Sequence, residues 1–496
     1  MSWSLASPIG SASDDNFHLA STWCSHGLRQ GVCEESVLSG YRRLPTPIAN
    51  AGTCYLGDGE KSALCTNLEL LGPGPQMTPT NRFAADGIIS GQQSLFYWVN
   101  GFLVSANFEL SILVMRFLNS VILLGLLILA ARSRSVEANV RLRVVLLSIS
   151  IPVFFWTVTS NSSSSWTFLG AAFAWFFLDS LLIGPQRTQK SFAIVGLLLS
   201  VLLSLGSRSE SAPFLLVQFA TFLGLRFHSR DWMVQNIRLV RLVIAGFAVL
   251  GYIFYSTELW VFFTDAFGYV RDDTPIARPD SWVLLHNLQS IPLLYYWLIS
   301  SIGVLRAADF TFPGTVGILM SIALAIVLYE SLRKATKRSQ IILLLILLTA
   351  LVIPLIMLQS NKLLLGEELL PRYFFPLFVL FVGFSVFQSP LRFRLGRGQS
   401  RFIASCLSLA HLIVLRLIIL RHVIGIEEFG LFDLDRGTEW WWTLKSIPSP
   451  MTVWFVGSVA FSVLAFSTLS KAVRSHDEQL TDAYSHEQPR GSEVSI

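Results

Sequence analysis

The chain has 496 residues, of which 52% are hydrophobic and only 14% are charged, and its mean hydropathy is +0.56. Soluble domains carry about 25% charged residues, so this composition excludes an ordinary soluble protein and indicates a membrane protein. The net charge of +5 comes from short Lys and Arg clusters between apolar runs. Such clusters are typical of cytoplasmic loops, so we expect no nucleic acid among the partners.

The chain begins MSWSLASPIG, which resembles the last turns of an apolar helix followed by its exit from the membrane. It has neither the basic region nor the apolar core of a signal peptide. A long external segment nevertheless needs a device to export it. We therefore expect a further transmembrane helix upstream, which would give twelve spans with both termini inside. The alternative is that the segment crosses unaided.

Residues 1–108 are expected to form the first external segment, and they hold four of the five cysteines. An even number of cysteines in an exported segment predicts two disulfides. Among the three possible connectivities we prefer the local one, which pairs Cys24 with Cys33 and Cys54 with Cys65. Their spacings are not those of a zinc site, so no metal is expected on these cysteines.

Apolar runs that can cross a hydrocarbon core of about 30 Å, roughly 20 residues of helix, recur through the rest of the chain. They predict an all-α, polytopic membrane helix bundle over residues 109–470. The eleven predicted spans are 109–131, 142–158, 166–183, 191–206, 211–227, 239–262, 313–331, 340–358, 371–389, 402–421 and 451–470.

The turns between these runs alternate in charge. The set rich in Arg and Lys, predicted to be cytoplasmic, comprises 132–143, 185–190, 226–241, 333–338 and 392–401. The other set comprises 160–166, 207–213, 263–312, 359–371 and 422–450. This alternation predicts an N-terminal segment outside the plasma membrane and a cytoplasmic C-terminal tail. The polar tail, residues 471–496, is expected to be disordered.

Segment 263–312 is apolar and aromatic toward its end, but Pro292 and polar residues interrupt it. A full span here would invert every later loop and place the basic turn at 333–338 outside. We therefore expect external helices that lie in the membrane interface, where Trp and Tyr are enriched. The aromatic residues expected at headgroup level are Trp282, Tyr295, Tyr296 and Trp297.

Five short motifs recur in one order along the chain: PIGSASDDNFHLASTWC (8–24), LVMRFLNS (113–120), SNSSSSW (160–166), SIGVLRAADFTFP (301–313) and LLPRYFFPL (369–377). In this order they resemble an actinobacterial polytopic membrane family of unknown function, domain-of-unknown-function family 2142. More distantly the chain resembles the GT-C glycosyltransferases, which take sugars from polyprenyl-phosphate carriers. The motifs depart from the family pattern at Ser162, at Arg306 and Ala307, and at Pro371, where the family commonly has Pro, Gly-Trp and Gly.

The GT-C resemblance implies an acidic catalytic motif in the first external segment, and Asp14 and Asp15 are the candidates for the base. A carboxylate that is partly desolvated beside a like charge has its pKa raised toward a useful range. The resemblance favours Asp14 as the base, with Asp15 orienting a neighbour or a metal. The alternative is that the pair only caps a short helix. His18 would share their helical face and either bind phosphate or hold a carboxylate; otherwise it is a surface histidine.

Four further residues are candidates for binding a lipid phosphate. Arg116 lies inside an apolar helix near its external end, where a charge needs a partner. That partner is either a phosphate, a carboxylate such as Glu109, or water reached by snorkelling. Arg208 sits in a short external hairpin that is otherwise an ordinary solvated turn. Arg372 and Tyr373 open a helix at the external face, where a bound anion would explain the arginine; Glu367 or Glu368 is the alternative partner.

These observations predict a glycosyltransferase that moves a sugar from a polyprenyl-phosphate carrier to a cell-envelope glycan or protein. The ionisable residues gather on one side, whereas a transporter places them and its broken helices near the midplane. The alternatives are a transporter or flippase for lipid-linked sugars, or an inactive scaffold. No metal ligands are assigned, although a divalent cation is compatible with the chemistry; membrane lipids and the lipid-linked donor are the expected partners.

Overall fold

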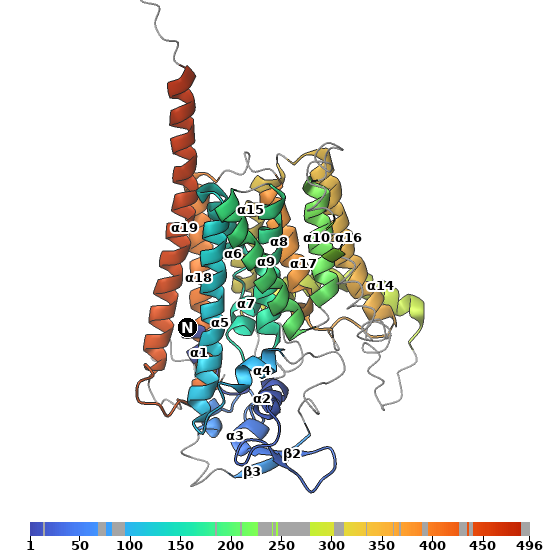
Figure 1. The fold of residues 1–496 in the computed structure, drawn as a ribbon, viewed down its shortest axis with the longest axis vertical. Helices are drawn as coiled ribbons and strands as arrows, with labels where there is room; N and C mark the ends of the chain where they lie inside the picture. The colour runs from blue at the N-terminus through green and yellow to red at the C-terminus, as the bar shows by residue number, and fades with distance from the viewer. Residues whose placement is uncertain are drawn as a thin grey trace, which may run out of the picture.

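Helices that run roughly along one direction form the body of the protein, and a small region with short strands lies at one end (Figure 1). The computed structural model describes residues 1–12, 15–67, 76–81, 95–183, 186–208, 211–226, 241, 245–246, 278–301, 312–333, 335–360, 362–366, 369–388, 395–425, 434–435 and 440–487. The predicted all-α membrane helix bundle is confirmed by this arrangement.

Within these residues, seven helices are long and apolar enough to cross a membrane. They are α5 (Phe108–Ser133), α8 (Ser164–Leu182), α9 (Arg187–Ser207), α15 (Gly314–Leu332), α16 (Lys337–Ser360), α18 (Arg397–Val423) and α19 (Pro450–Glu487). Shorter apolar helices occupy two more predicted spans, α10 (Ala212–Arg226) and α17 (Phe375–Phe387), which follows the 3-10 turn η6 (Pro371–Phe374). The predicted span at 239–262 lies outside the described residues, apart from residues 241, 245 and 246.

The predicted span at 142–158 is not straight. It consists of α6 (Val136–Ser148) and α7 (Pro152–Val158), which meet at an angle of 96°. Proline has no amide hydrogen and disfavours helical geometry in the residue before it, so α6 ends ahead of Pro152. The hydroxyls of Ser148 and Ser150 donate to carbonyls one turn back. The break is buried in protein, which is where a membrane protein tolerates irregular backbone.

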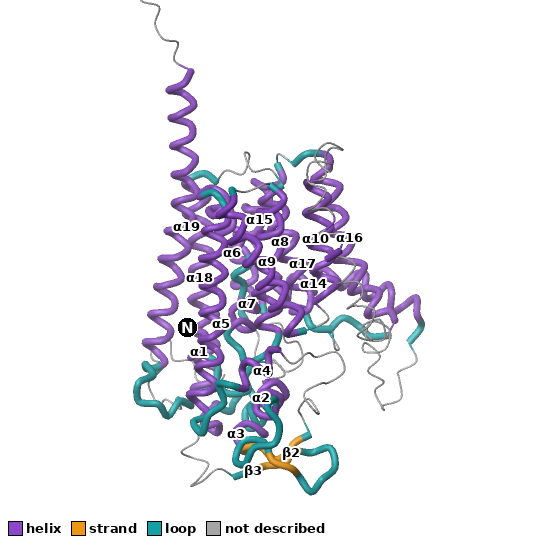
Figure 2. The backbone as a smooth tube through the Cα atoms, in the orientation of Figure 1, coloured by secondary structure: helices purple, strands orange, loops and turns teal. Residues whose placement is uncertain are grey.

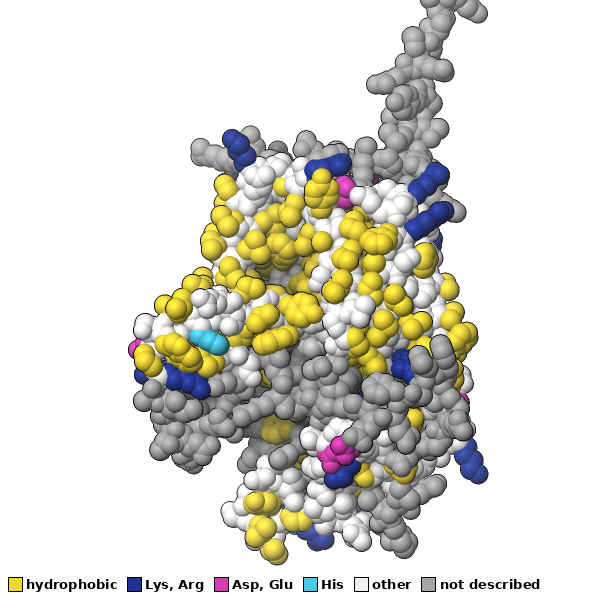
Figure 3. Space-filling model, turned by 180° about the vertical axis from the view of Figure 1, so that it is seen from behind, with side chains coloured by type: hydrophobic (Ala, Val, Ile, Leu, Met, Phe, Trp, Pro, Cys, Tyr) yellow, Lys and Arg dark blue, Asp and Glu magenta, His cyan; other side chains and the backbone are white. Residues whose placement is uncertain are grey.

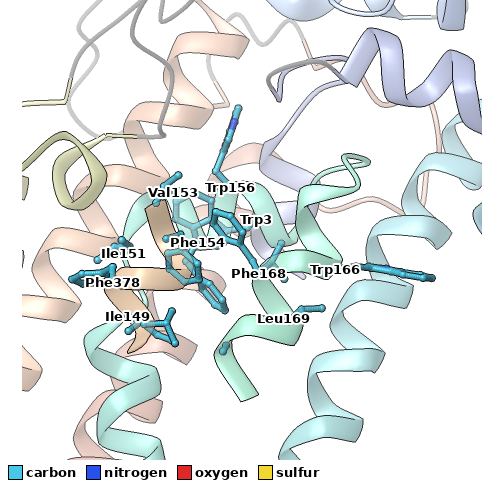
Figure 4. Packing of buried hydrophobic residues seen from close by; sticks show 14 of the residues in the cluster. Trp3, Ile149, Ile151, Val153, Phe154, Trp156, Trp166, Phe168, Leu169 and Phe378 are labelled. Atoms are coloured by element: carbon cyan, nitrogen blue, oxygen red, sulfur yellow. The ribbon is translucent and has the colours of Figure 1, made fainter. Parts of the chain in front are cut away.

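Helix α8 forms the centre of the bundle, because nearly every one of its side chains is buried. Phe168 of α8 stacks on Phe375 of α17 with ring centroids 4.1 Å apart, and Phe154 of α7 stacks on Phe375 as well. Figure 4 shows Phe154, Phe168 and Phe378 in one group, with Trp166 directed toward a neighbouring helix. Its indole nitrogen donates to Asn119 of α5 at 2.9 Å.

The outer faces of the bundle are apolar. Figure 3 shows hydrophobic side chains over the middle of one face and basic side chains mainly above and below them. On α5 the exposed apolar residues include Val114, Val121, Leu124 and Ile128. Such a surface would aggregate in water but suits the hydrocarbon interior of a membrane.

The basic turns meet at one end of the bundle. Arg134, just after α5, forms a salt bridge at 2.5 Å with Asp179 near the end of α8. Gln399 of α18 donates to Glu330 of α15 at 2.8 Å. The N-terminal region lies at the opposite end, while α19 projects beyond the basic end (Figure 1). The two predicted sets of loops are therefore separated in space within the described residues.

Helix α19 continues to Glu487, seventeen residues into the tail for which disorder was expected. No Gly or Pro follows Ser470 within this stretch. Extending a helix that packing has already nucleated costs far less than starting one, which accounts for the extension.

The N-terminal region begins with α1 (Ser2–Ala6), which packs against α5, α18 and α19. Disulfides join Cys24 to Cys33 and Cys54 to Cys65, so the predicted pairing is confirmed. Three short strands form an antiparallel sheet in the order β1-β2-β3. The remaining elements are α2 (Asp15–Cys24), β1 (Glu34–Glu35), β2 (Arg42–Pro45), α3 (Thr46–Ala49), η1 (Ala63–Thr66), β3 (Met77–Thr80) and α4 (Leu95–Gly101).

In segment 263–312 the described part is mainly a single helix, α14 (Asp280–Ser300), which projects obliquely from the side of the bundle (Figure 2). Its buried face is Val283, Asn287, Ile291, Leu294 and Leu298. Asn287 holds the loop after α16, because it donates to the Leu363 carbonyl and accepts from the Leu365 amide, both at 2.8 Å. The opposite face exposes Trp282, Leu285, Leu288 and Tyr296.

Candidate functional site

Arg116, in the first long helix α5, is completely buried and faces the N-terminal segment. Its guanidinium donates to the carbonyls of Ser4, Ser7 and Pro8 at 2.9, 2.5 and 3.1 Å. Its Nε donates to the Asn161 side chain at 2.8 Å. These contacts close the guanidinium off within the protein. They favour the structural alternative for Arg116 over the predicted phosphate binding.

The carboxylate that Arg116 faces is Asp15, at 3.9 Å, and neither side chain is exposed. Glu109, the partner considered from sequence, instead accepts hydrogen bonds from the Thr443 amide at 3.0 and 3.1 Å. Asp14, the other predicted base, lies outside the described residues. Asp15 therefore faces a buried cation, as expected if it orients a neighbouring side chain.

His18 is buried on α2, one turn after Asp15. Its Nδ1 lies 2.7 Å from the hydroxyl of Tyr97 on α4. Phe96, the neighbour of Tyr97, packs edge to face on Trp166 at the start of α8, with ring centroids 5.2 Å apart. His18 is thus no surface histidine, and it ties α2 through α4 to the beginning of α8.

Residues 160–165, which we call the serine loop, join the broken span to α8 and are all buried. Asn161 of this loop accepts from Arg116, and the hydroxyl of Ser164 accepts from Arg208 at 2.9 Å. The two arginines come from positions 92 residues apart in sequence yet contact the same short loop. The sequence suggested an ordinary external loop here; its run of hydroxyl side chains was the only signal of a buried polar element.

Arg208 also contacts Tyr373, which lies with Arg372 in the turn η6 just before α17. Its guanidinium carbon lies over the ring of Tyr373 at 5.6 Å from the centroid, and that of Arg372 lies over the same ring at 5.3 Å. Arg372 is 5% exposed, whereas Arg208 and Tyr373 are half-buried. We call these three residues the Arg–Tyr–Arg cluster. Aromatic faces stabilise guanidinium groups, so the ring holds two positive charges in one place.

The structure thus gathers the described candidates into contacts at the disulfide end of the bundle. Arg116 faces Asp15 and donates to Asn161, whereas Arg208 donates to Ser164 and lies with Arg372 over the Tyr373 ring. Sequence reasoning missed Asn161, Ser164 and Tyr97, because none of them carries a charge or a recognisable spacing. Among the described residues no group of three or more His, Cys, Asp or Glu side chains could hold a metal ion, so no metal ligands are assigned.

The fold and this end of the bundle define a polytopic helical membrane protein with a disulfide-bonded N-terminal region. The chain belongs to the family described as Predicted membrane protein (DUF2142), whose model matches residues 1–381. The family resemblance drawn from the motifs is therefore confirmed. No curated protein and no solved structure matches the chain.

Proposed function

We propose that the protein is a glycosyltransferase of the GT-C kind that transfers a sugar from a polyprenyl-phosphate carrier to a cell-envelope acceptor. One observation carries the proposal. The serine loop is contacted at Asn161 by Arg116, which faces Asp15, and at Ser164 by Arg208, which shares the Tyr373 ring with Arg372. One loop thus links the arginine that faces the acidic segment to one of two neighbouring cations, and transfer from a lipid phosphate needs an acid and cations at the same end of the bundle.

The proposed reaction is a single displacement with inversion. Asp14 takes the proton of the acceptor hydroxyl as its oxygen bonds to the anomeric carbon of the sugar. The bond from that carbon to the phosphate oxygen breaks, and the phosphate departs with the electron pair. Arg208 and Arg372 neutralise the departing phosphate, since charged hydrogen bonds to phosphate are the strong ones. Asp15 and Arg116 hold the N-terminal segment against the serine loop.

The disulfide end is proposed to face the outside of the plasma membrane and the opposite end to face the cytoplasm. The basic turns at that opposite end support this orientation, because Lys and Arg accumulate in cytoplasmic loops. Disulfides support it as well, since they persist in oxidising compartments. The lipid-linked donor would then be used in the outer leaflet.

Transport of a lipid-linked sugar is the second candidate, and the broken span favours it. Transporters build their sites from discontinuous helices, and α6 and α7 meet at 96°. The break is closed by packed aromatic and aliphatic side chains such as Phe154 and Ile151, both buried. The ionisable contacts lie instead at the serine loop, which is why we favour transfer over transport.

The test uses the full chain in lipid nanodiscs with a panel of polyprenyl-phosphate sugars and cell-envelope acceptors. We expect transfer from one donor, abolished by Asp14→Asn and strongly reduced by Asp15→Asn. Glu35→Gln, an exposed acid of the same region, is the matched control and should leave the rate unchanged. Full turnover in both aspartate variants would remove the proposed base. Movement of the donor across vesicle membranes without any transfer would establish the transport alternative.

A further inference from the structure

Two hydroxyl groups of the serine loop are buried without a hydrogen-bond partner in the part of the chain that the structure describes. They belong to Ser163 and Ser165, and both residues are 0% exposed. Buried polar side chains are hydrogen-bonded in the large majority of cases. Leaving one unpaired costs about 1–3 kcal/mol. Two such groups two residues apart in one loop therefore need an explanation.

Both hydroxyls stand at the beginning of α8. Ser163 is its N-cap residue, and its side chain makes no capping hydrogen bond. The amides of the first turn are already bonded within the loop, because Ser165 donates to the Ser162 carbonyl and Trp166 to the Ser163 carbonyl. Helical side chains tilt toward the N-terminus of their helix. These hydroxyls therefore lie close to the positive end of the α8 dipole.

The same end of α8 carries positive side chains. The hydroxyl of Ser164, between the two unpaired ones, accepts from Arg208 at 2.9 Å. Arg208 and Arg372 both lie within 5.6 Å of the Tyr373 ring centroid, so at most twice that distance separates their guanidinium carbons. Hydroxyl donors, the positive end of a helix dipole and guanidinium groups together match the oxygens of a phosphate.

We propose that Ser163 and Ser165 bind the phosphate group of the lipid carrier at the N-terminus of α8, beside Arg208. The inference deepens the proposed function, because it names the donors that hold the leaving group before and after transfer. A neutral sugar would not require the cations. The two hydroxyls would fix the positions of the phosphate oxygens, which the arginines alone would not do. The half-buried Arg208 and Tyr373 mark the side from which the headgroup enters.

The test measures binding of farnesyl phosphate, farnesol and inorganic phosphate to the protein in nanodiscs, for the wild type and a Ser163→Ala/Ser165→Ala variant. Removing hydroxyls that lack a protein partner should leave thermal stability unchanged or slightly higher. Farnesyl phosphate should bind the variant at least about tenfold more weakly, the loss expected for hydrogen bonds to a charged group. Binding of farnesol should not change. If inorganic phosphate competes with farnesyl phosphate, the site recognises the phosphate group alone. If inorganic phosphate does not compete, binding requires the prenyl chain as well.

Ser400→Ala is the matched control. Ser400 is also a buried, unpaired hydroxyl near the start of a helix, α18, but it lies at the basic end. Its variant should bind farnesyl phosphate as the wild type does. Equal affinity of the double variant and the wild type would overturn the inference, even if sugar transfer proceeds. Serine-dependent phosphate binding without any transfer would uphold it while the proposed enzymatic activity fails.

Discussion

The guanidinium of Arg116 lies 3.9 Å from the carboxylate of Asp15, and both side chains are fully buried. The two residues are 101 positions apart in sequence, so their approach fixes the N-terminal segment on helix α5. Three backbone carbonyls of that segment accept from the same guanidinium. This arrangement makes Asp15 part of the packed protein and not of a loop in bulk water.

Asp15→Asn should destabilise the protein as well as lower the rate of the proposed sugar transfer. Removing one partner of a buried ion pair leaves the other charge uncompensated and costs about 3–5 kcal/mol. The measurement is the thermal unfolding midpoint in detergent, followed by size-exclusion chromatography. Glu34→Gln is the control, because Glu34 pairs with Arg43 on the surface at 3.7 Å, where such pairs contribute about 0–1 kcal/mol. An unchanged midpoint for Asp15→Asn would contradict a structural role.

The cysteines of the N-terminal region should react only after reduction, and from outside the cell. A membrane-impermeant maleimide is applied to intact cells with and without a reductant. We expect labelling of Cys24, Cys33, Cys54 and Cys65 only with the reductant, because all four are disulfide-bonded. Cys406 is the free cysteine and is buried in α18, so Cys406→Ser should not alter the labelling. Labelling that requires permeabilised cells would reverse the proposed orientation.

Tyr373→Leu should weaken binding of a prenyl phosphate, whereas Tyr373→Phe should not. The leucine removes the aromatic face on which Arg208 and Arg372 rest, and a cation–π contact at a partly exposed site contributes about 0.5–1 kcal/mol. Loss of both contacts predicts roughly a fivefold to thirtyfold lower affinity. Phenylalanine keeps the ring and serves as the control. Equal losses in both variants would point to the tyrosine hydroxyl instead.

Gly170→Ala should loosen the contact between α8 and α9. A methyl group at Gly170 would lie 2.1 Å from the Ser204 hydroxyl and 2.4 Å from the Ser200 carbonyl oxygen. Because one of these is backbone, the helices must move apart, which costs about 1–3 kcal/mol. Gly125→Ala, in α5 where nothing lies within 4 Å, should instead be neutral or stabilising. The measurement is the thermal unfolding midpoint of each variant. Equal shifts of the two midpoints would contradict close packing of α8 on α9 at Gly170.

Arg421→Gln should release the loop that carries the second disulfide. This buried arginine of α18 donates to the carbonyls of Tyr55, Asp58 and Lys61 at 3.1, 2.7 and 2.6 Å. Limited proteolysis should then cut residues 51–67 several times faster, with the helices intact, because three carbonyls lose their donor. Lys61→Gln, a change at an exposed side chain, is the control. Unaltered cleavage of Arg421→Gln would show that packing alone holds the loop.

The sequence by itself determined the features that depend on local composition. Apolar runs predicted the helix bundle, and the charges of the turns predicted which loops meet at each end. The pairing of Cys24 with Cys33 and of Cys54 with Cys65 followed from short separations, since nearby cysteines meet most easily. Each of these inferences uses neighbours in the chain, and the structure confirms the bundle and the disulfides.

Only the tertiary structure decided which distant residues face one another. Nothing near Arg116 in sequence indicates that it binds Ser4, Ser7, Pro8 and Asn161. Nor does the sequence around Trp442 indicate that this side chain is buried and donates to the Leu5 carbonyl at 2.9 Å. The serine loop was predicted to be a short external loop, and its side chains are buried in the structure. A polar group inside a membrane protein must find its partner wherever packing brings one, and packing joins segments that the sequence keeps more than a hundred residues apart.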